Sequence, residues 1–289
     1  MQSSLDMAEM GFKVYLVEKT AAIGGRMPML DKTFPTNDCS MCILSPKLVE
    51  CGRHRNIEVL TTSEVVSLTG KPGKYQVKIK QHPRFIDVDK CLGCSNCAEA
   101  CPVKVDDEFN QNIGKRKAVY KLYPQAYPNA YTIDPTQCLR LRKGYNPKVC
   151  GKCIEACQAG AIDHQMKEKE IDITVGAVII CTGFDLFNAE LRGEFGYGIY
   201  PNVITSLQFE RMLSASGPYK GHVQRPSDNK EPKKIAFIQC VGSRDVCKDN
   251  GGYCSSVCCM YATKESIIAR EHVPGLDSTI FCIDVRAFG

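Results

Sequence analysis

Alternating apolar and polar positions predict an α/β chain. Residues 1–11 carry apolar side chains at helical spacing up to Gly11, and residues 13–19 form a strand-like apolar run that stops at Glu18. A helix followed by such a strand is the second half of a βαβ nucleotide-binding unit, in which the acid takes a ribose hydroxyl. Glu18 is therefore a candidate ribose ligand, with a solvated residue at a strand end as the alternative. The first strand and glycine-rich turn of such a unit are missing, so we expect truncation at the start.

The pattern changes in the middle of the chain. Residues 57–86 alternate β-branched and polar residues around the turn sequence GKPGK and predict strands, whereas residues 85–165 lose the alternation and hold eight cysteines. Strand character returns at 169–184, where the apolar run 175–184 predicts a buried strand. We expect a small α+β domain at 85–165, inserted into an α/β body formed by residues 1–84 and 166–232.

The end of the chain predicts the start of another nucleotide-type domain, residues 233–289. Residues 214–234 are rich in Gly, Pro and Ser and predict a polar linker. Beyond it, 233–242 predict a strand, 260–272 a helix and 278–289 a further strand. We expect this domain to be cut short at its end.

Composition points to metal chemistry. The chain has 289 residues, enough for about two domains, and its 18 cysteines without an export signal favour metal ligands in a cytoplasmic protein over disulfides. No apolar run approaches the roughly 18 residues of a membrane helix. The formal charge of +5 comes without an aromatic and basic binding module, so we expect neither nucleic acid nor membrane insertion.

The strongest chemical signal is the sequence CLGCSNCAEACP. Its spacing, C-x2-C-x2-C-x3-C-P, is that of [4Fe-4S] ligation, where three thiolates hold one cluster and the fourth reaches a second cluster. A zinc site ordinarily uses two separated pairs of cysteines. The predicted ligands are Cys91, Cys94, Cys97 and Cys101.

A second cysteine run repeats this order, with a longer loop after its first cysteine and Gln158 in place of the proline. Its cysteines are Cys138, Cys150, Cys153 and Cys157. If the fourth cysteine of each run crosses over, Cys91, Cys94, Cys97 and Cys157 hold one cluster, and Cys138, Cys150, Cys153 and Cys101 hold the other. The insert is then a two-cluster ferredoxin domain that passes single electrons.

A third set of cysteines lies where a predicted strand gives way to a predicted helix. It consists of Cys240, Cys254, Cys258 and Cys259, with Cys247 as a spare. A helix start offers unpaired N–H groups and a positive dipole end, which stabilise thiolates and an anionic cluster as they do a phosphate. We expect a third [4Fe-4S] cluster here, with buried inert thiols as the alternative.

Two weaker signals flank the insert and together favour FAD. Glycines and an arginine follow Glu18 closely, where backbone can approach a phosphate and a guanidinium can pair with it. The sequence TGF ends the predicted buried strand, a usual place for contact with a dinucleotide. Each signal alone is also typical of an ordinary turn. The candidate flavin contacts are Glu18, Lys19, Gly24, Gly25, Arg26, Thr182, Gly183 and Phe184.

The remaining cysteines carry weaker predictions. Cys39 and Cys42 form an isolated C-x2-C, which suits a redox dithiol or half of a cluster site completed by another segment or partner. Inert thiols are a third possibility. Cys51, Cys181 and Cys282 are single cysteines in apolar or strand settings, and we expect them to be structural.

The combined motifs resemble the iron-sulfur flavoprotein of heterodisulfide reductase, its A subunit, over nearly the whole chain. The resemblance is carried by VEKTAAIGGRMPMLDKTFPTNDCSMCIL, CLGCSNCAEACPV, CTGF, and CVGSRD followed by YCSSVCCMYATKES. It implies a thioredoxin-reductase-like body that binds FAD, an inserted ferredoxin domain, and a cluster in place of the pyridine-nucleotide site. It also implies that Lys264 lies near the flavin, where a cation would stabilise an anionic reduced flavin. An exposed helix lysine is the alternative.

The resemblance also implies a function. Members work in cytoplasmic complexes with the B and C subunits of heterodisulfide reductase and a hydrogenase or other electron-input partner. Some bifurcate electron pairs at the flavin between a ferredoxin and the CoM-S-S-CoB heterodisulfide, whose own site is on the B subunit. The alternatives are the related protein of a quinone-interacting or sulfur-oxidising complex, a passive ferredoxin-like electron carrier, and a zinc-bound scaffold.

Overall fold

The computed structural model describes residues 1–245 and 252–287, and the chain divides into two compact units. Unit 1 comprises Met1–Gly25, Ile43–Phe109 and Lys115–Thr182, and unit 2 comprises Arg26–Cys42, Asn110–Gly114 and Gly183–Gly289. None of the described helices combines the length and the apolar character needed to span a bilayer. The domain boundaries expected from the sequence stay a prediction.

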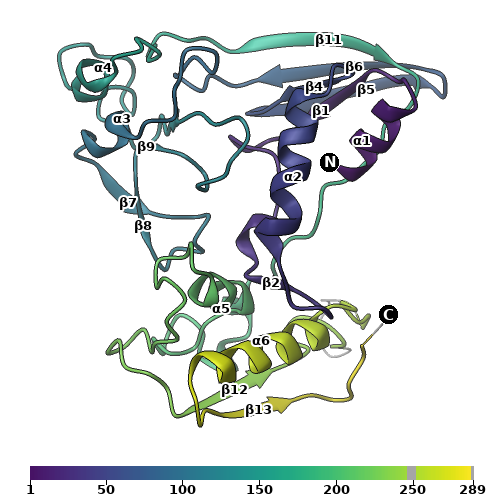
Figure 1. The fold of residues 1–289 in the computed structure, drawn as a ribbon, viewed down its shortest axis with the longest axis vertical. Coiled ribbons are helices and arrows are strands. Elements are labelled where there is room, and N and C mark those ends of the chain that lie inside the picture. Colours follow the sequence, from purple (N-terminus) through teal and green to yellow (C-terminus); the bar gives the residue numbers. More distant parts are fainter. Residues whose placement is uncertain (246–251, 288–289) are drawn as a thin grey trace. The chain divides into compact units, whose positions relative to one another are not determined.

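Unit 1 begins with a helix on a parallel strand pair. Helix α1 (Gln2–Glu9) packs on β1 (Val14–Val17) and β4 (Ile57–Leu60), and its buried side chains include Leu5 and Ala8 (Figure 1). Gly11, at φ 89°, follows the helix in a left-handed conformation that glycine adopts without steric cost. The helix and strand predicted from the first nineteen residues are confirmed, and Glu18 follows β1 directly.

The second sheet of unit 1 is an antiparallel meander. Strand β6 (Lys74–Gln81) lies between β5 (Ser63–Lys71) and β11 (Lys169–Val175), with Ile171 opposite Ile79. Ile79 and Val77 point into a small core with Leu60. The alternation predicted for residues 57–86 and the start of the 169–184 run are therefore confirmed, because one face of these strands is buried and the other is polar.

The buried strand predicted at 175–184 is wrong beyond Val175. The last register pair of β11 joins Val175 to Tyr75, one residue after β6 begins, and Gly73 N–H donates to Gly176 O at 2.9 Å. Residues 177–188 have no regular structure, and Ile180 is 78% exposed. A strand needs a hydrogen-bonded neighbour, and the described residues supply none past this point.

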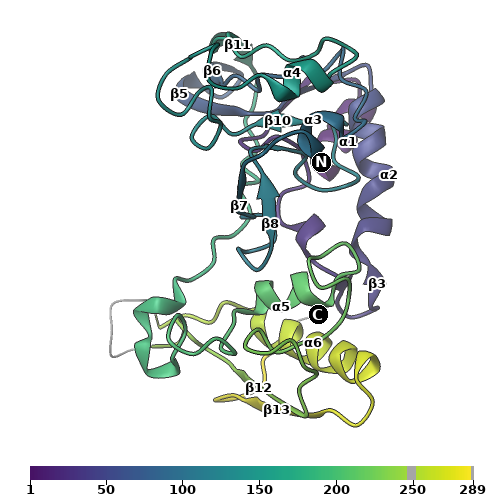
Figure 2. The ribbon, with the colours of Figure 1, turned by 90° about the vertical axis from the view of Figure 1, so that its left-hand side faces the viewer.

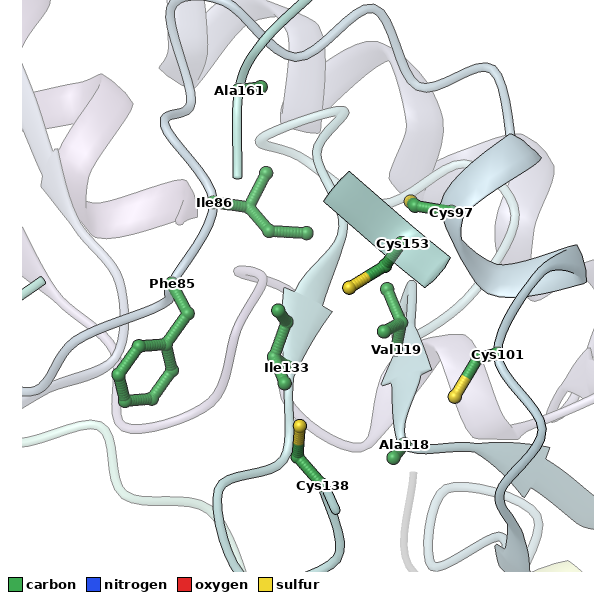
Figure 3. Packing of buried hydrophobic residues seen from close by; sticks show 10 residues of the cluster. All are labelled: Phe85, Ile86, Cys97, Cys101, Ala118, Val119, Ile133, Cys138, Cys153 and Ala161. Carbon is green, nitrogen blue, oxygen red and sulfur yellow. The ribbon is translucent and has the colours of Figure 1, made fainter. Parts of the chain in front are cut away.

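The segment from Phe85 to Ala161 builds a core from cysteines as well as apolar side chains. Figure 3 shows Cys97, Cys101, Cys138 and Cys153 among Ile86, Val119 and Ile133. Its elements are short: α3 (Asn96–Glu99), β7 (Lys104–Asp106), β8 (Lys115–Lys117), β9 (Val119–Tyr120), β10 (Thr132–Ile133) and α4 (Lys152–Ala156). Such a core is too small in apolar volume to be ordinary, which agrees with the predicted small insert.

Unit 2 has a parallel strand pair covered by helices. Strands β12 (Lys234–Ile238) and β13 (Asp277–Phe281) pair in parallel, and α6 (Cys258–His272) lies along them in both views (Figure 1, Figure 2). Helix α5 (Ser206–Leu213) packs on α6 and starts with a capping box at Thr205. The predicted strands and helix near the end of the chain are confirmed.

The rest of unit 2 consists of short elements and turns. Its remaining elements are η1 (Met27–Met29), β2 (Lys32–Thr33), β3 (Asp38–Cys39), η2 (Ala189–Leu191) and η3 (Gly193–Phe195), and α2 (Ser40–Arg53) begins in this unit. The polar linker predicted at 214–234 is wrong as a free linker. Val223 is 2% exposed and packs with Met212 and Ile268, so this segment joins the core of the unit.

Candidate functional site

The first of two cysteine-lined cavities lies in unit 1. Its lining includes Cys91, Cys94, Cys97 and Cys157. Cys97 belongs to α3 and Cys157 directly follows α4, and these two helices pack together. Ile86, Tyr131 and Ala161 complete the apolar part of the wall. The structure thus brings together the four residues predicted for one cluster.

The thiols of this first cavity influence one another. Burial first, and then the neighbouring Cys91 and Cys157 sulfurs, raise the pKa of Cys97 to about 12. The backbone N–H of Ala161 donates to Cys157 Sγ at 3.4 Å. Several thiolates side by side in a buried place repel one another unless a cation neutralises them, so this wall suits a metal-held group.

The second cavity gathers the other predicted set. Its lining includes Cys101, Cys138, Cys150 and Cys153. Burial raises the pKa of Cys153 to about 11, with Cys138 and Cys150 as the next causes. Each cavity therefore takes three cysteines from one run and the fourth from the other run, as the spacing predicts for two clusters.

The two cavities differ in charge. Arg140, Lys152 and His164 line the second cavity, whereas none of the side chains that line the first cavity is a Lys, Arg, His, Asp or Glu. His164 is buried, and its Nε2 lies 3.8 Å from Cys153 Sγ. Within the described residues, Arg140 Nε and His164 Nδ1 are buried without a hydrogen-bond partner. Sequence reasoning missed both residues, because single basic residues in a cysteine-rich stretch carry no spacing signal.

The third predicted set surrounds the start of α6. Cys258 is the first residue of the helix, Cys259 follows it, and Cys240 lies beyond β12 at φ 61°. Arg286 N–H donates to Cys259 Sγ at 3.4 Å and lowers the pKa of that thiol, but burial and the neighbouring Cys258 and Cys240 sulfurs outweigh it and raise the pKa.

The structure thus brings together Cys240, Cys258 and Cys259. Arg244, which pairs with Asp284, also interacts with Cys240. Cys254 accepts a hydrogen bond from Ser256 N–H at 3.4 Å. Cys247 lies outside the described residues. Among the described residues, no three His, Cys, Asp or Glu side chains converge closely enough to hold a single metal ion.

The two flavin signals meet at one point in unit 2. The guanidinium carbon of Arg26 lies 5.7 Å from the centre of the Phe184 ring, and its Nη2 is 3.9 Å from the exposed Asp185 carboxylate. Gly183 has φ 73°, and a Cβ built on it would contact nothing. Arg26 and Phe184 are therefore neighbours although they are far apart in the sequence.

The other candidate flavin contacts belong to unit 1. Gly24 and Gly25 have φ of 129° and 59°, so both need the backbone freedom of glycine. Glu18 accepts hydrogen bonds from the Thr20 backbone and hydroxyl. Lys19 is exposed, and Thr182 lies in the irregular segment after β11 rather than at the end of a buried strand.

Lys264 is buried on α6 and held by an ion pair. Its Nζ donates to Glu210 Oε1 and, at 2.9 Å, to the carbonyl of Lys32. Glu210 also accepts from Asp31 N–H at 2.9 Å. The exposed-lysine alternative is wrong, since Lys264 is 2% exposed.

Two acids beside this pair carry perturbed protonation. Burial first, and then Glu210, raises the pKa of Glu265 well above its usual value, and the same two causes in the same order raise the pKa of Asp31. Nothing in the sequence singles out Glu210 or Glu265, because acids on a helix are ordinarily exposed.

The remaining cysteines separate into buried and exposed ones. Cys51 is fully buried, as expected of a structural thiol, whereas Cys181 and Cys282 are exposed, so the structural setting expected for them is wrong. Both follow the ends of strands, where the chain leaves the sheet. Cys39 and Cys42 are exposed as well.

Comparison with known proteins adds a family to this geometry. The 4Fe-4S binding domain family matches residues 84–105, which confirms a ferredoxin-like domain in the predicted insert. Over 288 residues the chain is 48% identical to the A subunit of the H(2):CoB-CoM heterodisulfide,ferredoxin reductase of Methanothermobacter thermautotrophicus. It is 52% identical over 288 residues to the iron-sulfur A subunit 2 of the CoB--CoM heterodisulfide reductase of Methanopyrus kandleri.

A third relative is the A subunit of the Ferredoxin/F(420)H(2)-dependent CoB-CoM heterodisulfide reductase of Methanosarcina acetivorans, 46% identical over 289 residues. In each case 100% of this chain is covered. The chain spans 42% of the length of the first two relatives and 35% of the third.

Proposed function

We propose that this chain, which belongs to the family of heterodisulfide reductase A subunits, binds FAD and three [4Fe-4S] clusters and transfers electrons within a heterodisulfide reductase complex. The observation that carries the proposal is the exchange of the fourth cysteine between the two cavities. That exchange is the ligand pattern of two-cluster ferredoxins. The donors fit the group, because thiolates crowded in a buried wall need a bound cation to neutralise them.

The residues of the chain supply three cluster sites in this proposal. Each of the two cavities holds one cluster with its four cysteines, and Cys240, Cys254, Cys258 and Cys259 hold the third at the start of α6. Iron-sulfur clusters exchange single electrons, while FAD exchanges electrons in pairs. The chain positions the sulfurs and excludes water from them, since Cys97, Cys101, Cys138, Cys153 and Cys259 are all buried.

The flavin is proposed to lie in a thioredoxin-reductase-like body. Arg26 can pair with a phosphate of FAD, and the glycines beside it let backbone approach that phosphate. Lys264 is held by Glu210 in a buried place, so its charge acts through a low dielectric on any anionic group nearby. The role proposed for Lys264 is to stabilise the anionic reduced flavin.

The whole protein is proposed to act with the B and C subunits of heterodisulfide reductase and an electron-input partner such as a hydrogenase. The names of the relatives include H(2), ferredoxin and F(420)H(2), so we infer that the electron donor differs among family members. Electron bifurcation between ferredoxin and the CoM-S-S-CoB heterodisulfide is the activity we propose, in the cytoplasm. The two regions flanking the ferredoxin insert form the FAD domain, and residues 233–289 start the second nucleotide-type domain.

Anaerobic reconstitution of the full-length gene product tests this proposal. Iron, acid-labile sulfide and flavin are counted on the segments that this chain represents. About twelve irons with one FAD match three clusters, and roughly eight irons remove the third site from the proposal. Zinc without acid-labile sulfide, or iron without flavin, contradicts the electron-transferring flavoprotein.

Paired serine variants test the crossed ligands. Cys157→Ser should cost about four irons, the content of one cubane, and adding Cys91→Ser to it should cost no more. Adding Cys138→Ser instead should remove both clusters. Cys282→Ser, a change at an exposed single cysteine, is the control and should keep the full count. Loss of the same cluster in Cys157→Ser and Cys138→Ser would show that the fourth ligands do not cross.

A further inference from the structure

We propose that Cys39 and Cys42 form a reversible dithiol–disulfide couple on unit 2, separate from the cluster cysteines, in which Cys39 attacks an external disulfide and Cys42 resolves it. Neither residue belongs to the three proposed cluster sites. The proposal does not depend on the proposed function, because it concerns a different pair of sulfurs.

The pair lies at the junction of a hairpin and a helix. Cys39 is the last residue of β3, which pairs with β2 so that Lys32 lies directly opposite Cys39. The next residue, Ser40, begins α2 and is fully buried, and its N–H donates to Asp31 O at 3.1 Å. The buried anchor holds both cysteines at the surface on the first turn of a 14-residue helix.

The two sulfurs are already in contact and accessible. Both side chains are exposed, and Cys42 N–H donates to Cys39 Sγ at 3.2 Å. A side-chain hydrogen bond between the two thiols is the main cause that raises the pKa of Cys42. Cys42 therefore keeps its proton and shares it with the Cys39 sulfur, which divides the roles between attacking and resolving thiol.

The surroundings of Cys39 favour its thiolate. The helix start directs a free N–H and the positive end of the dipole at this sulfur. Lys32 lies across the hairpin, where directly opposite side chains approach within about 5 Å between Cβ atoms. An exposed sulfur next to positive charge and a second thiol is the environment typical of redox-active cysteines.

A half-site for a cluster or metal fits the pair less well. The sulfurs in the two cavities are shielded by α3, α4 and an apolar wall, whereas Cys39 and Cys42 face solvent. Among the described side chains, no third His, Cys, Asp or Glu joins the pair to form a metal site.

The chemical step is thiol–disulfide exchange with a small-molecule disulfide. The Cys39 thiolate attacks one sulfur, the external S–S bond breaks, and one half leaves as a thiolate. Cys42 then gives up its proton and attacks the Cys39 sulfur, which releases the second half as a thiol. The two protein sulfurs lose two electrons in total and the external disulfide gains them.

Equilibration of the full-length, cluster-loaded protein with glutathione redox buffers under anaerobic conditions tests the proposal. Samples are acid-quenched, alkylated and digested with trypsin, which cuts after Lys32 and Lys47 and leaves residues 33–47 with Cys39 and Cys42 as their only cysteines. We expect this peptide to convert reversibly between a doubly alkylated form and an unalkylated form lighter by two hydrogens.

Single variants distinguish the two roles. Cys42→Ser should accumulate a mixed disulfide of Cys39 with glutathione, because the resolving thiol is missing. Cys39→Ser should leave Cys42 roughly tenfold less reactive or slower still, as expected for a thiol with less thiolate. Cys282→Ser, at an exposed cysteine outside the pair, should behave as the parent protein.

Two outcomes would overturn the couple. The first is that both cysteines stay alkylated at every glutathione ratio. The second is that they resist alkylation until iron is chelated, and that Cys39→Ser and Cys42→Ser lose iron. Retention of the parent iron and sulfide in both variants supports the proposal. The iron count of the parent protein tests the cluster proposal separately.

Discussion

At the scale of single residues, charge near the sulfurs distinguishes the two ferredoxin-type cavities. Arg140 and His164 line the second cavity and keep buried nitrogens without partners in the described residues, while the first cavity has no ionisable side chain apart from its cysteines and Tyr131. Positive charge and N–H donors near a cluster stabilise its more negative, reduced state. The second site should therefore have the higher reduction potential.

Replacing Arg140 by Gln should lower the potential of that cluster. The reduced state loses a nearby cation, so the reduction equilibrium should shift on the order of tenfold, about 59 mV for one electron. A redox titration followed by electron paramagnetic resonance measures the shift. Arg142→Gln, at an exposed position two residues away, is the matched control. Equal shifts in both variants, or a shift only in the other cluster, would contradict the proposed tuning.

A second residue-scale prediction concerns the buried acid Glu265. Burial first, and Glu210 second, raises its pKa in the folded protein, so its contribution to stability is complete below the unfolded pKa and is lost as pH rises through the folded one. Glu265→Gln should unfold at a less pH-dependent temperature, with its largest gain over the parent at alkaline pH. Thermal unfolding followed by circular dichroism between pH 5 and about 9 measures this.

The exposed Glu271 on the same helix supplies the control for that experiment. Its carboxylate pairs with Lys32 at 3.5 Å with both side chains partly solvated, so Glu271→Gln should change stability by less than about 1 kcal/mol. If Glu265→Gln instead destabilises the protein equally at all pH values, Glu265 is not the group that titrates.

At the scale of elements, the β5–β6 hairpin shows how local geometry limits sequence. Gly70 and Gly73 both have positive φ, but a Cβ on Gly70 would lie 2.4 Å from Lys74 O, whereas a Cβ on Gly73 would contact nothing. The same turn therefore contains one glycine required by conformation alone and one required by conformation and space.

Alanine at these two positions should destabilise the protein to different degrees. Gly73→Ala should cost about 1–2 kcal/mol for the left-handed backbone. Gly70→Ala should cost more, because backbone atoms of the partner strand must also move. Urea unfolding followed by circular dichroism compares the two. Equal losses would show that the contact with Lys74 relaxes at no cost.

At the scale of the whole molecule, the two units depend on different forces. The core around Phe85–Ala161 includes four buried cysteines, while the core of unit 2 is built from side chains such as Phe209, Met212 and Ile268. Metal binding contributes to folding where the ligands form the core. Loss of iron should therefore affect these two cores unequally.

Removing iron with a chelator under reducing conditions should release the ferredoxin-like segment first. Hydrogen exchange of amides in residues 85–165 should accelerate strongly, because the cysteine-lined core loses its centre. Amides of β12 and of the end of α6 near Ile268 should stay protected. Uniform loss of protection across the chain would mean that both cores depend on the clusters.

The sequence by itself determined the features that depend on neighbours in the chain. The cysteine spacing places sulfurs on one or two turns, and the polar and apolar pattern sets the strands around residues 57–81 and the helix that begins at Cys258. Even the crossing of Cys101 and Cys157 followed from spacing, because a fourth cysteine three residues past a short helix turns away from the first three.

Only the tertiary structure decided features that need a distant partner. Residues 176–184 have strand-forming side chains, yet their strand is absent because β6 provides no neighbour beyond Tyr75. Lys264 has the sequence of an ordinary helix lysine, and its burial depends on Glu210 from another helix. The charges beside the second cavity likewise come from residues that spacing does not mark. Such contacts depend on packing between segments far apart in the chain, which local patterns do not encode.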